Sequence, residues 1–252
     1  MPERPSRFLE DQRRFFAEAD AGHFFWQTQN PYFARTERDL LDGFVVGSGQ
    51  TILELGCGEG GNLVNVLAAR RAVPRIVVGL DLFERKLSFA RRQGVPAAFV
   101  CADAGVLPFR NGAFDLVLCH DLLHHLEDRE GALEELRRVT KRGGTVWIVE
   151  PNGKNLLIRL LALARPHERG QLRNSVDSMT ELVARYFPRV EVELRQPFPL
   201  YRLVLHYQFG FPRLGASRVA AAALDAGEGV CRALCPRQRW AYIVAKAGER
   251  PC

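Results

Sequence analysis

The sequence predicts an α/β fold in which helices cover both faces of a parallel sheet. Short apolar segments with strand-like composition alternate with segments of helical periodicity along the 252-residue chain. A glycine-rich loop joins the first of these strands to a helix, and aspartates stand at the ends of the next two strands. The length fits one large domain with additions, and no tandem repeat interrupts it.

The glycine-rich loop follows the first predicted strand, residues 51–55, and leads into a helix predicted over residues 62–69. Single residues separate Gly56, Gly58 and Gly60, and such a joint lets a bulky ligand approach the backbone. The same stretch also fits the dinucleotide pattern, and a tight turn without a ligand is a further alternative. Glu54 stands two residues before Gly56, where its carboxylate could hydrogen-bond a cationic group.

Two aspartates follow the next predicted strands. The strand over residues 75–80 ends at Asp81, where a carboxylate suits the two hydroxyls of a ribose. The strand over residues 97–101 leads to Asp103, which could accept a hydrogen bond from an adenine amino group. Either aspartate could instead cap the following helix. Their occurrence at consecutive strand ends, after this loop, favours ligand binding.

With these residues in place, the chain resembles the class I S-adenosylmethionine-dependent methyltransferases, in the group that includes the ubiquinone-biosynthesis type. The resemblance covers about residues 50–152. It is carried by five blocks in the family's order, residues 52–60, 78–81, 102–109, 114–126 and 136–152. The last block resembles the family's Gly-Gly turn into the fifth strand, although Arg142 stands where the family usually has proline.

The resemblance implies a three-layer α/β/α sandwich with a seven-stranded, mostly parallel sheet whose last strand is antiparallel. The remaining strands are expected at residues 114–119, 145–150, 190–194 and 240–245. Residues 1–252 are expected to form a single methyltransferase domain. Its expected parts are a helical cap (1–45), a core (46–195), an insertion that forms a lid or oligomer surface (196–238) and a last strand (239–247).

The resemblance also implies S-adenosylmethionine as cofactor and S-adenosylhomocysteine as product. The residues expected to bind the cofactor are Glu54, Gly56, Cys57, Gly58, Gly60, Asn62, Asp81, Leu82, Asp103, Ala104, Cys119 and His120. We expect Glu54 to contact the amino-acid end of the cofactor, directly or indirectly. A dinucleotide would have placed its phosphate at this position.

Methyl transfer requires the protein to align the acceptor, exclude water and remove a proton from the acceptor. His120, His124 and His125 cluster just beyond the strand at residues 114–119, and in similar enzymes the position of His125 is a candidate base. The histidines could instead only shape the loop. Glu150 could orient a histidine, touch substrate or cap the next helix. The candidate catalytic residues are therefore His125, His124, His120 and Glu150.

Two additions outside the matched blocks are expected to determine the acceptor. Residues 6–44 look helical and are rich in aromatic residues, for which core packing is the default interpretation. Residues 195–239 are too long for a hairpin loop and could form a lid, a dimer surface or a membrane-facing patch. The apolar segment at residues 155–164 must contact protein, substrate or lipid on one side. We favour a lid over peripheral membrane contact, because few basic residues flank this segment. We expect a small, apolar or aromatic acceptor methylated at oxygen or carbon.

The amino-acid composition limits the kinds of binding partner that we expect. The net charge is +6, but only four of the 35 basic residues are lysine, and arginine pairs fall near predicted helix ends, so we expect no nucleic-acid partner. The absence of a signal-like amino terminus and of a long apolar run leads us to expect a cytoplasmic protein whose six cysteines are reduced. Cys231 and Cys235 lie one helical turn apart without further ligands, so no metal site is expected.

Two other functions remain open at this point. The cofactor could be structural in an enzyme that catalyses a non-methylating step such as cyclisation. The chain could also be a non-catalytic regulatory protein that keeps the cofactor pocket. Methyl transfer into a metabolite would separate the first expectation from both alternatives.

Overall fold

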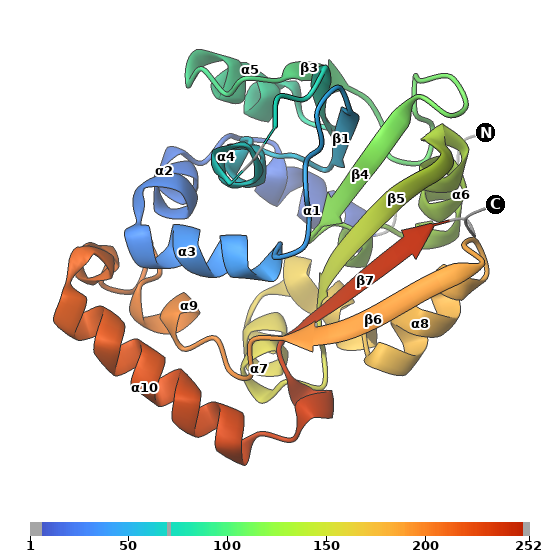
Figure 1. The fold of residues 1–252 in the computed structure, drawn as a ribbon. Coiled ribbons are helices and arrows are strands. Elements are labelled where there is room, and N and C mark those ends of the chain that lie inside the picture. Colours follow the sequence, from blue (N-terminus) through green and yellow to red (C-terminus); the bar gives the residue numbers. More distant parts are fainter. Residues whose placement is uncertain (1–6, 70–71, 249–252) are drawn as a thin grey trace.

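The computed structural model describes residues 7–69 and 72–248, so the first six residues of the expected cap and Cys252 lie outside the described residues. Seven strands form one sheet in the order β3-β2-β1-β4-β5-β7-β6 (Figure 1). The strands are β1 (Thr51–Leu55), β2 (Ile76–Asp81), β3 (Ala98–Cys101), β4 (Phe114–His120), β5 (Thr140–Pro151), β6 (Arg189–Arg195) and β7 (Tyr242–Gly248). Strands β1 to β5 pair in parallel, whereas β7 is antiparallel to both β5 and β6. The predicted fold class is confirmed.

Helices lie on both sides of this sheet, as Figure 1 shows. The α-helices are α1 (Arg7–Phe16), α2 (Ala21–Gln29), α3 (Pro31–Leu40), α4 (Gly61–Ala68), α5 (Glu84–Arg92), α6 (Arg129–Val139), α7 (Leu156–Ala164), α8 (Val176–Ala184), α9 (Tyr201–Val204) and α10 (Arg218–Leu234). Short 3-10 helices are η1 (Leu123–His125), η2 (Pro166–Arg173), η3 (Pro212–Ala216) and η4 (Arg237–Arg239).

Strand β5 begins earlier than the predicted residue 145. Thr140 already pairs with Phe114 of β4, and the register shifts between Phe114 and Leu116 at an irregularity. Gly143 has a φ of 76°, which an L side chain rarely adopts, and this glycine lets the chain turn within the early part of the strand. The sequence pattern missed this segment because its first residues are polar.

Alternate residues of the buried strands face two different cores, because successive side chains of a strand point to opposite faces. Leu53 and Leu55 of β1 belong to the core that includes Leu133 of α6 and Met179 of α8. Ile52 belongs to the other core, with residues of α3, α4 and α5. This arrangement explains why β1 reads as a continuous buried run.

A third cluster joins the amino-terminal helices to the segment between β6 and β7. Its members are Trp26, Tyr32, Phe33, Tyr201, Leu205 and Leu224, so aromatic residues of both additions pack together. The Tyr32 hydroxyl donates to Asp225 Oδ1 of α10 at 2.9 Å, and Asn30 Nδ2 donates to the Pro212 carbonyl at 2.8 Å. The two additions therefore pack as one body, although more than 150 residues of sequence separate these partners.

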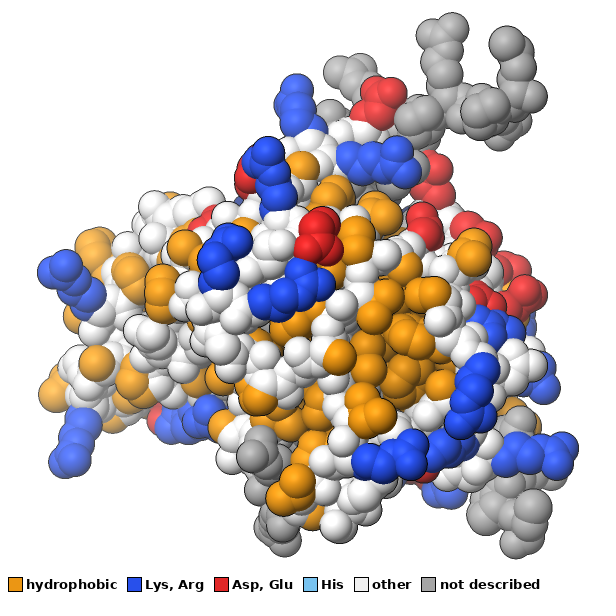
Figure 2. All heavy atoms as spheres, turned by 90° about the horizontal axis from the view of Figure 1, so that it is seen from above, with side chains coloured by type: hydrophobic (Ala, Val, Ile, Leu, Met, Phe, Trp, Pro, Cys, Tyr) orange, Lys and Arg blue, Asp and Glu red, His pale blue; other side chains and the backbone are white. Residues whose placement is uncertain are grey.

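The surface combines exposed apolar side chains with dispersed positive charge. Figure 2 shows hydrophobic side chains gathered in a patch on one face, with Lys and Arg side chains around it singly or in small groups. Leu156, Leu160 and Leu163 of α7 are among the exposed hydrophobic side chains. Within residues 7–69 and 72–248, no helix combines the length and the apolar character needed to cross a membrane. The five cysteines in this part of the chain are free thiols.

Candidate functional site

A cavity of about 1140 Å³ lies at the carboxyl ends of β1, β2 and β4, where ligands bind in open α/β sheets. We call one part of its wall the glycine-loop end, made by Gly56, Cys57, Gly58, Asn62, Asp81 and Asp103. We call another part the aromatic end, made by Trp26, Arg165, Arg202, His206 and Tyr207. The volume is at or above the upper limit of roughly 300–1,000 Å³ for a pocket that holds one small ligand.

The glycine loop has the backbone geometry that only glycine adopts readily. Gly56, Gly58 and Gly60 have φ values of 74°, 52° and 84°. A Cβ on Gly56 would lie 2.9 Å from the Leu122 side chain, whereas the nearest atom to a Cβ on Gly58 is Lys86 Nζ at 3.9 Å. The backbone at Gly58 is therefore open to the cavity, and a ligand can approach it closely.

Asp81 ties this loop to the neighbouring strand. Its Oδ2 accepts a hydrogen bond from the Gly58 N–H at 2.9 Å, and its Oδ1 accepts from the Phe83 N–H at 2.9 Å. Burial raises the pKa of Asp81 above its usual value. Asp103 is exposed and accepts a hydrogen bond from the Gly105 N–H at 2.8 Å. Both carboxylates line the cavity, as the sequence predicted for strand ends on one edge.

Glu54 is fully buried in β1, and neither of its carboxylate oxygens has a hydrogen-bond partner among the described residues. Burial raises its pKa to about 8. Asn62 donates from Nδ2 to His120 Nδ1 at 2.7 Å, and its own Oδ1 is likewise buried without a partner within the described chain. These orphaned acceptors fit a cationic amino group near the loop.

The other predicted cofactor residues divide into two groups. Leu82, Ala104 and His120 line the cavity together with the loop residues. Gly60 and Cys119 are buried, and with Glu54 they lie outside the cavity lining. Any effect of these three residues on a ligand would therefore act through their neighbours.

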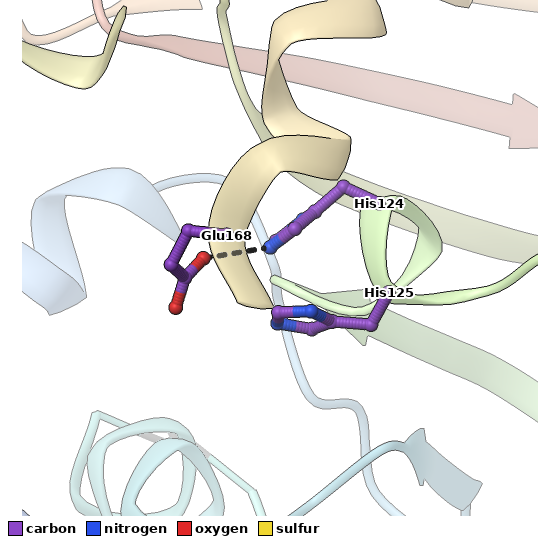
Figure 3. Close-up of side chains that lie close together, drawn as sticks. All are labelled: His124, His125 and Glu168. Atoms are coloured by element: carbon purple, nitrogen blue, oxygen red, sulfur yellow. Dashed lines mark hydrogen bonds and ion pairs between the residues drawn. The ribbon is translucent and has the colours of Figure 1, made fainter. Parts of the chain in front are cut away.

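His124 lies between two carboxylates, of which Figure 3 shows that of Glu168. Its Nδ1 is 2.7 Å from Glu150 Oε2 and its Nε2 is 3.3 Å from Glu168 Oε2. Although burial opposes protonation, the charges of Glu150 and Glu168 raise the pKa of His124 to about 10. Burial also opposes ionisation of Glu150, but the charge of His124 lowers the pKa of Glu150 to about 2. His124 is thus held as a cation and is a poor proton acceptor near neutral pH.

Glu150 also fixes the loop that follows β4. Its Oε1 accepts hydrogen bonds from the N–H groups of Leu122 at 3.0 Å and Leu123 at 2.6 Å. Its Oε2 accepts from Asn174 Nδ2 at 3.0 Å. Because Glu150 is fully buried and does not line the cavity, its described contacts position the histidines rather than meet a ligand.

His125 and His120 both line the cavity. His125 Nδ1 lies 3.0 Å from Gln12 Nε2 of α1, and burial together with the His124 charge lowers its pKa to about 3. His125 is therefore neutral and weakly basic. His120 Nε2 is buried and has no hydrogen-bond partner among the described residues.

His124, His125 and Glu168 form the one group in the described chain whose ligand atoms lie within 4.8 Å of one another, as a metal ion would require. Figure 3 shows the three side chains directed toward a common space. His124 and Glu168 already pair with each other there, and Gln171 Nε2 also donates to Glu168. Since the hydrogen bonds account for these polar atoms, we assign no metal to the cluster.

Sequence reasoning missed Glu59 and the whole aromatic end. Glu59 Oε1 accepts from the Asp20 N–H at 3.0 Å, so the glycine loop holds the start of α2. Burial opposes its ionisation, but His23 and Lys86 lower the pKa of Glu59 to about 2. At the aromatic end the ring of Trp26 lies 5.1 Å from His206 and 5.6 Å from Tyr207. No motif marked these residues, because they come from distant segments.

The sheet order, with its antiparallel β7, and the glycine loop at the tip of β1 define the class I methyltransferase fold. The chain matches the family described as "Methyltransferase domain" over residues 53–148. It therefore contains a methyltransferase domain of the class I, S-adenosylmethionine-dependent type, and S-adenosylmethionine is the cofactor of that class.

Individual proteins agree with this family. The chain is 33% identical over 133 residues to a ubiquinone biosynthesis O-methyltransferase of Chromobacterium violaceum, covering 50% of this chain and 54% of that protein. It is 31% identical over 134 residues to a norajmaline N-methyltransferase of Rauvolfia serpentina, covering 52% and 45%. The chain spans about half the length of the curated relatives it matches.

Among solved structures, a phosphoethanolamine N-methyltransferase 2 of Haemonchus contortus in complex with S-adenosylmethionine has a TM-score of 0.69 at 19% identity. That match covers 100% of this chain and 62% of the other. At this identity the likeness supports the fold alone.

Proposed function

We propose that the protein binds S-adenosylmethionine at the glycine-loop end and transfers its methyl group to oxygen or carbon of a small apolar or aromatic molecule. The observation that carries this proposal is the open backbone at Gly58, beside Asp81 and Asp103 on one cavity wall. The named relatives include an O- and an N-methyltransferase, so they support methyl transfer without choosing the acceptor atom.

We assign the parts of the cofactor to residues on the basis of their chemistry. Asp81 stands where a carboxylate suits ribose hydroxyls, and Asp103 where a carboxylate suits the adenine amino group. The amide of Asn62, which lines the cavity, suits the cationic amino-acid end, and the buried Glu54 acts on that end through Asn62. S-adenosylmethionine, when bound, supplies an electrophilic methyl group on a good leaving group.

The remaining work of the chain is to place the acceptor and take its proton. His124 is held as a cation, so we propose that His124 and Glu150 are positioning residues. His120 is our candidate proton acceptor, ahead of the weakly basic His125. Since His120 Nδ1 accepts from Asn62, the His120 Nε2, 3.9 Å from Glu37 Oε2, takes a proton only when the Asn62 amide turns to accept from the Nδ1–H. Substitution His120→Ala should then lower turnover more than His125→Ala, with cofactor affinity preserved in both.

The cap, core and insertion boundaries stay our proposal, with the insertion acting as a lid on the cavity through Arg202, His206 and Tyr207. A dimer surface or peripheral membrane contact remains an alternative role for the same segment. A cytoplasmic setting also stays a prediction.

Calorimetry with S-adenosylmethionine and S-adenosylhomocysteine tests the cofactor proposal, and we expect both to bind. Transfer of a radiolabelled methyl group into a metabolite extract then tests catalysis and reports the acceptor. Undetectable binding of both compounds to folded protein would overturn the proposal. Binding without any transfer would instead favour a cyclising enzyme or a regulatory protein.

A further inference from the structure

Two hydrogen-bond donors face each other at the aromatic end without an acceptor between them. His206 Nδ1 accepts from the Gln208 N–H at 3.2 Å, and burial with nearby Arg165 lowers the pKa of His206 to about 4. A neutral imidazole whose Nδ1 accepts must carry its hydrogen on Nε2. That Nε2 lies 3.4 Å from Arg165 Nη2, and a guanidinium can only donate.

Two further donors at the same end are also unsatisfied. The Trp26 indole N–H and the Arg202 Nε–H are buried and have no hydrogen-bond partner among the described residues. Both residues line the cavity with Arg165 and His206. Buried donors without acceptors are costly, so several at one wall point to a ligand that supplies acceptors.

One positive charge at this end is not paired with a carboxylate of the described residues. Arg202 pairs with Glu37 through Nη2 at 2.9 Å, and Asp20 accepts a hydrogen bond from the Tyr207 hydroxyl at 2.8 Å. Arg165 has no carboxylate partner within residues 7–69 and 72–248; it contacts His206 and lies over the Phe209 ring. Its charge is therefore available to a ligand.

Planar rings surround these donors. The rings of Trp26, His206 and Tyr207 lie 4.8–5.6 Å apart, and His23 lies 5.5 Å from Tyr207. Such separations suit aromatic packing, and they provide flat apolar surface beside the donors.

We infer that the aromatic end is the acceptor subsite and takes a planar aromatic molecule that carries an anionic oxygen group, such as a carboxylate or a phosphate. The anionic oxygens accept from Arg165, His206 and Trp26, and the ring packs against the aromatic side chains. This inference rests on the proposed function, whose acceptor it describes.

The test is calorimetric titration of the full chain, saturated with S-adenosylhomocysteine, at physiological ionic strength. The probes are benzoate, phenyl phosphate, benzyl alcohol, and acetate with inorganic phosphate as ring-free anions. We expect benzoate or phenyl phosphate to bind at least about tenfold more tightly than benzyl alcohol or the ring-free anions. The ranking of benzoate against phenyl phosphate identifies the anion as carboxylate or phosphate.

Two variants locate the binding. Arg165→Met should weaken binding of the preferred ring anion by about tenfold, whereas Arg159→Met on the exposed face of the same helix should leave it unchanged. Trp26→Phe keeps a ring but removes the donor, and it should weaken binding a few-fold. Binding of S-adenosylhomocysteine by each variant serves as the folding control.

Equal affinity for benzyl alcohol and both ring anions would overturn the inference, as would no ring-anion binding or equal effects of Arg165→Met and Arg159→Met. If Arg165→Met fails to fold, an unchanged affinity in Trp26→Phe overturns it. Failure of the unsubstituted protein to bind S-adenosylhomocysteine would count against the proposed function instead. The two failures are thus distinguishable.

Discussion

The glycine-loop end and the aromatic end of the cavity are built in different ways. The first consists of one continuous loop and two strand tips, held by backbone hydrogen bonds such as Gly58 N–H to Asp81. The second collects side chains from α2, the end of α7 and the segment around α9. Backbone geometry fixes the first end, whereas tertiary packing of two additions fixes the second.

This difference separates what each end tolerates. At the glycine-loop end, shape depends on residues with left-handed backbone, so changes of side-chain size alter the surface itself. At the aromatic end, shape depends on side chains such as the buried Trp26, which packs in the third cluster. Residues of the loop at 121–126 also line the cavity, and the Glu150–His124–Glu168 group holds this loop.

The largest effect is expected at the buried carboxylate that holds this loop. Glu150→Ala removes one carboxylate partner of the His124 cation and the acceptor of three backbone N–H groups, which should reduce the free energy of unfolding by about 3–5 kcal/mol. Urea denaturation measures this change. The control Glu181→Ala removes an exposed pair with Arg185 and should cost less than about 1 kcal/mol. Equal costs would mean that Glu150 does not organise the loop.

A change confined to the glycine-loop end should affect cofactor binding first. Asp81→Asn removes the charge but keeps the size of the side chain that accepts from Gly58 and Phe83. We expect the affinity for S-adenosylhomocysteine to fall roughly 10- to 100-fold, as for a lost charged hydrogen bond. Calorimetry checks this, and the affinity of benzoate for the apoprotein should stay the same. A parallel loss of both affinities would show that the ends are not independent.

Glu54 is expected to lower the free energy of unfolding while it strengthens cofactor binding. Its pKa is raised from the usual 4.5 to about 8, so the folded state holds a proton that the unfolded state releases. Stability from this group is therefore lost as pH rises from about 4.5 through 8. Glu54→Gln should raise the apoprotein's unfolding free energy by roughly 4 kcal/mol at pH 8 and have no effect near pH 4. It should also weaken S-adenosylhomocysteine binding.

Thermal unfolding at the two pH values measures the stability part of this exchange. Glu193→Gln, at an exposed carboxylate of β6, provides the matched control. A variant that is no more stable at pH 8 than at pH 4, relative to the parent, contradicts the burial of an unpaired carboxylate.

The smallest effect is expected at the contact of α1 with the histidine loop. Gln12 Nε2 meets His125 Nδ1 at 3.0 Å and the His167 carbonyl at 3.3 Å. Gln12→Ala should lower the free energy of unfolding by about 1 kcal/mol, the usual effect of losing one hydrogen bond. The exposed Arg14→Ala on the same helix is the control. Hydrogen exchange of the α1 amides measures whether the helix opens more often in Gln12→Ala alone.

The glycine-loop end could be predicted because its residues are contiguous or stand at successive strand ends, which parallel pairing brings to one edge. The histidine cluster was also visible, as a run after β4. The roles within it were not, because Glu168 lies in no motif and its pairing with His124 spans 44 residues. The pKa values of His124 and His125 depend on that pairing, so the sequence could not indicate which of the two histidines is a cation.

The aromatic end could not be predicted in the same way. Trp26 and His206 were each visible as residues of an addition, but nothing local indicates that the two additions meet. Their contact depends on packing of Tyr32, Phe33 and Tyr201 in the third cluster. These rings are buried as the default expectation of core packing had it, and Trp26 belongs both to this cluster and to the cavity wall.

The joint body formed by the two additions has a consequence for recombining this domain with its relatives. Asp225 of α10 accepts hydrogen bonds from Tyr32 and Arg35 of α3, and Glu37 of α3 accepts one from Arg202. A chimera that exchanged only the segment between β6 and β7 would leave buried donors and acceptors of α3 without partners. On our proposal for the acceptor subsite, a change of acceptor preference requires that both segments, one from each addition, be exchanged together.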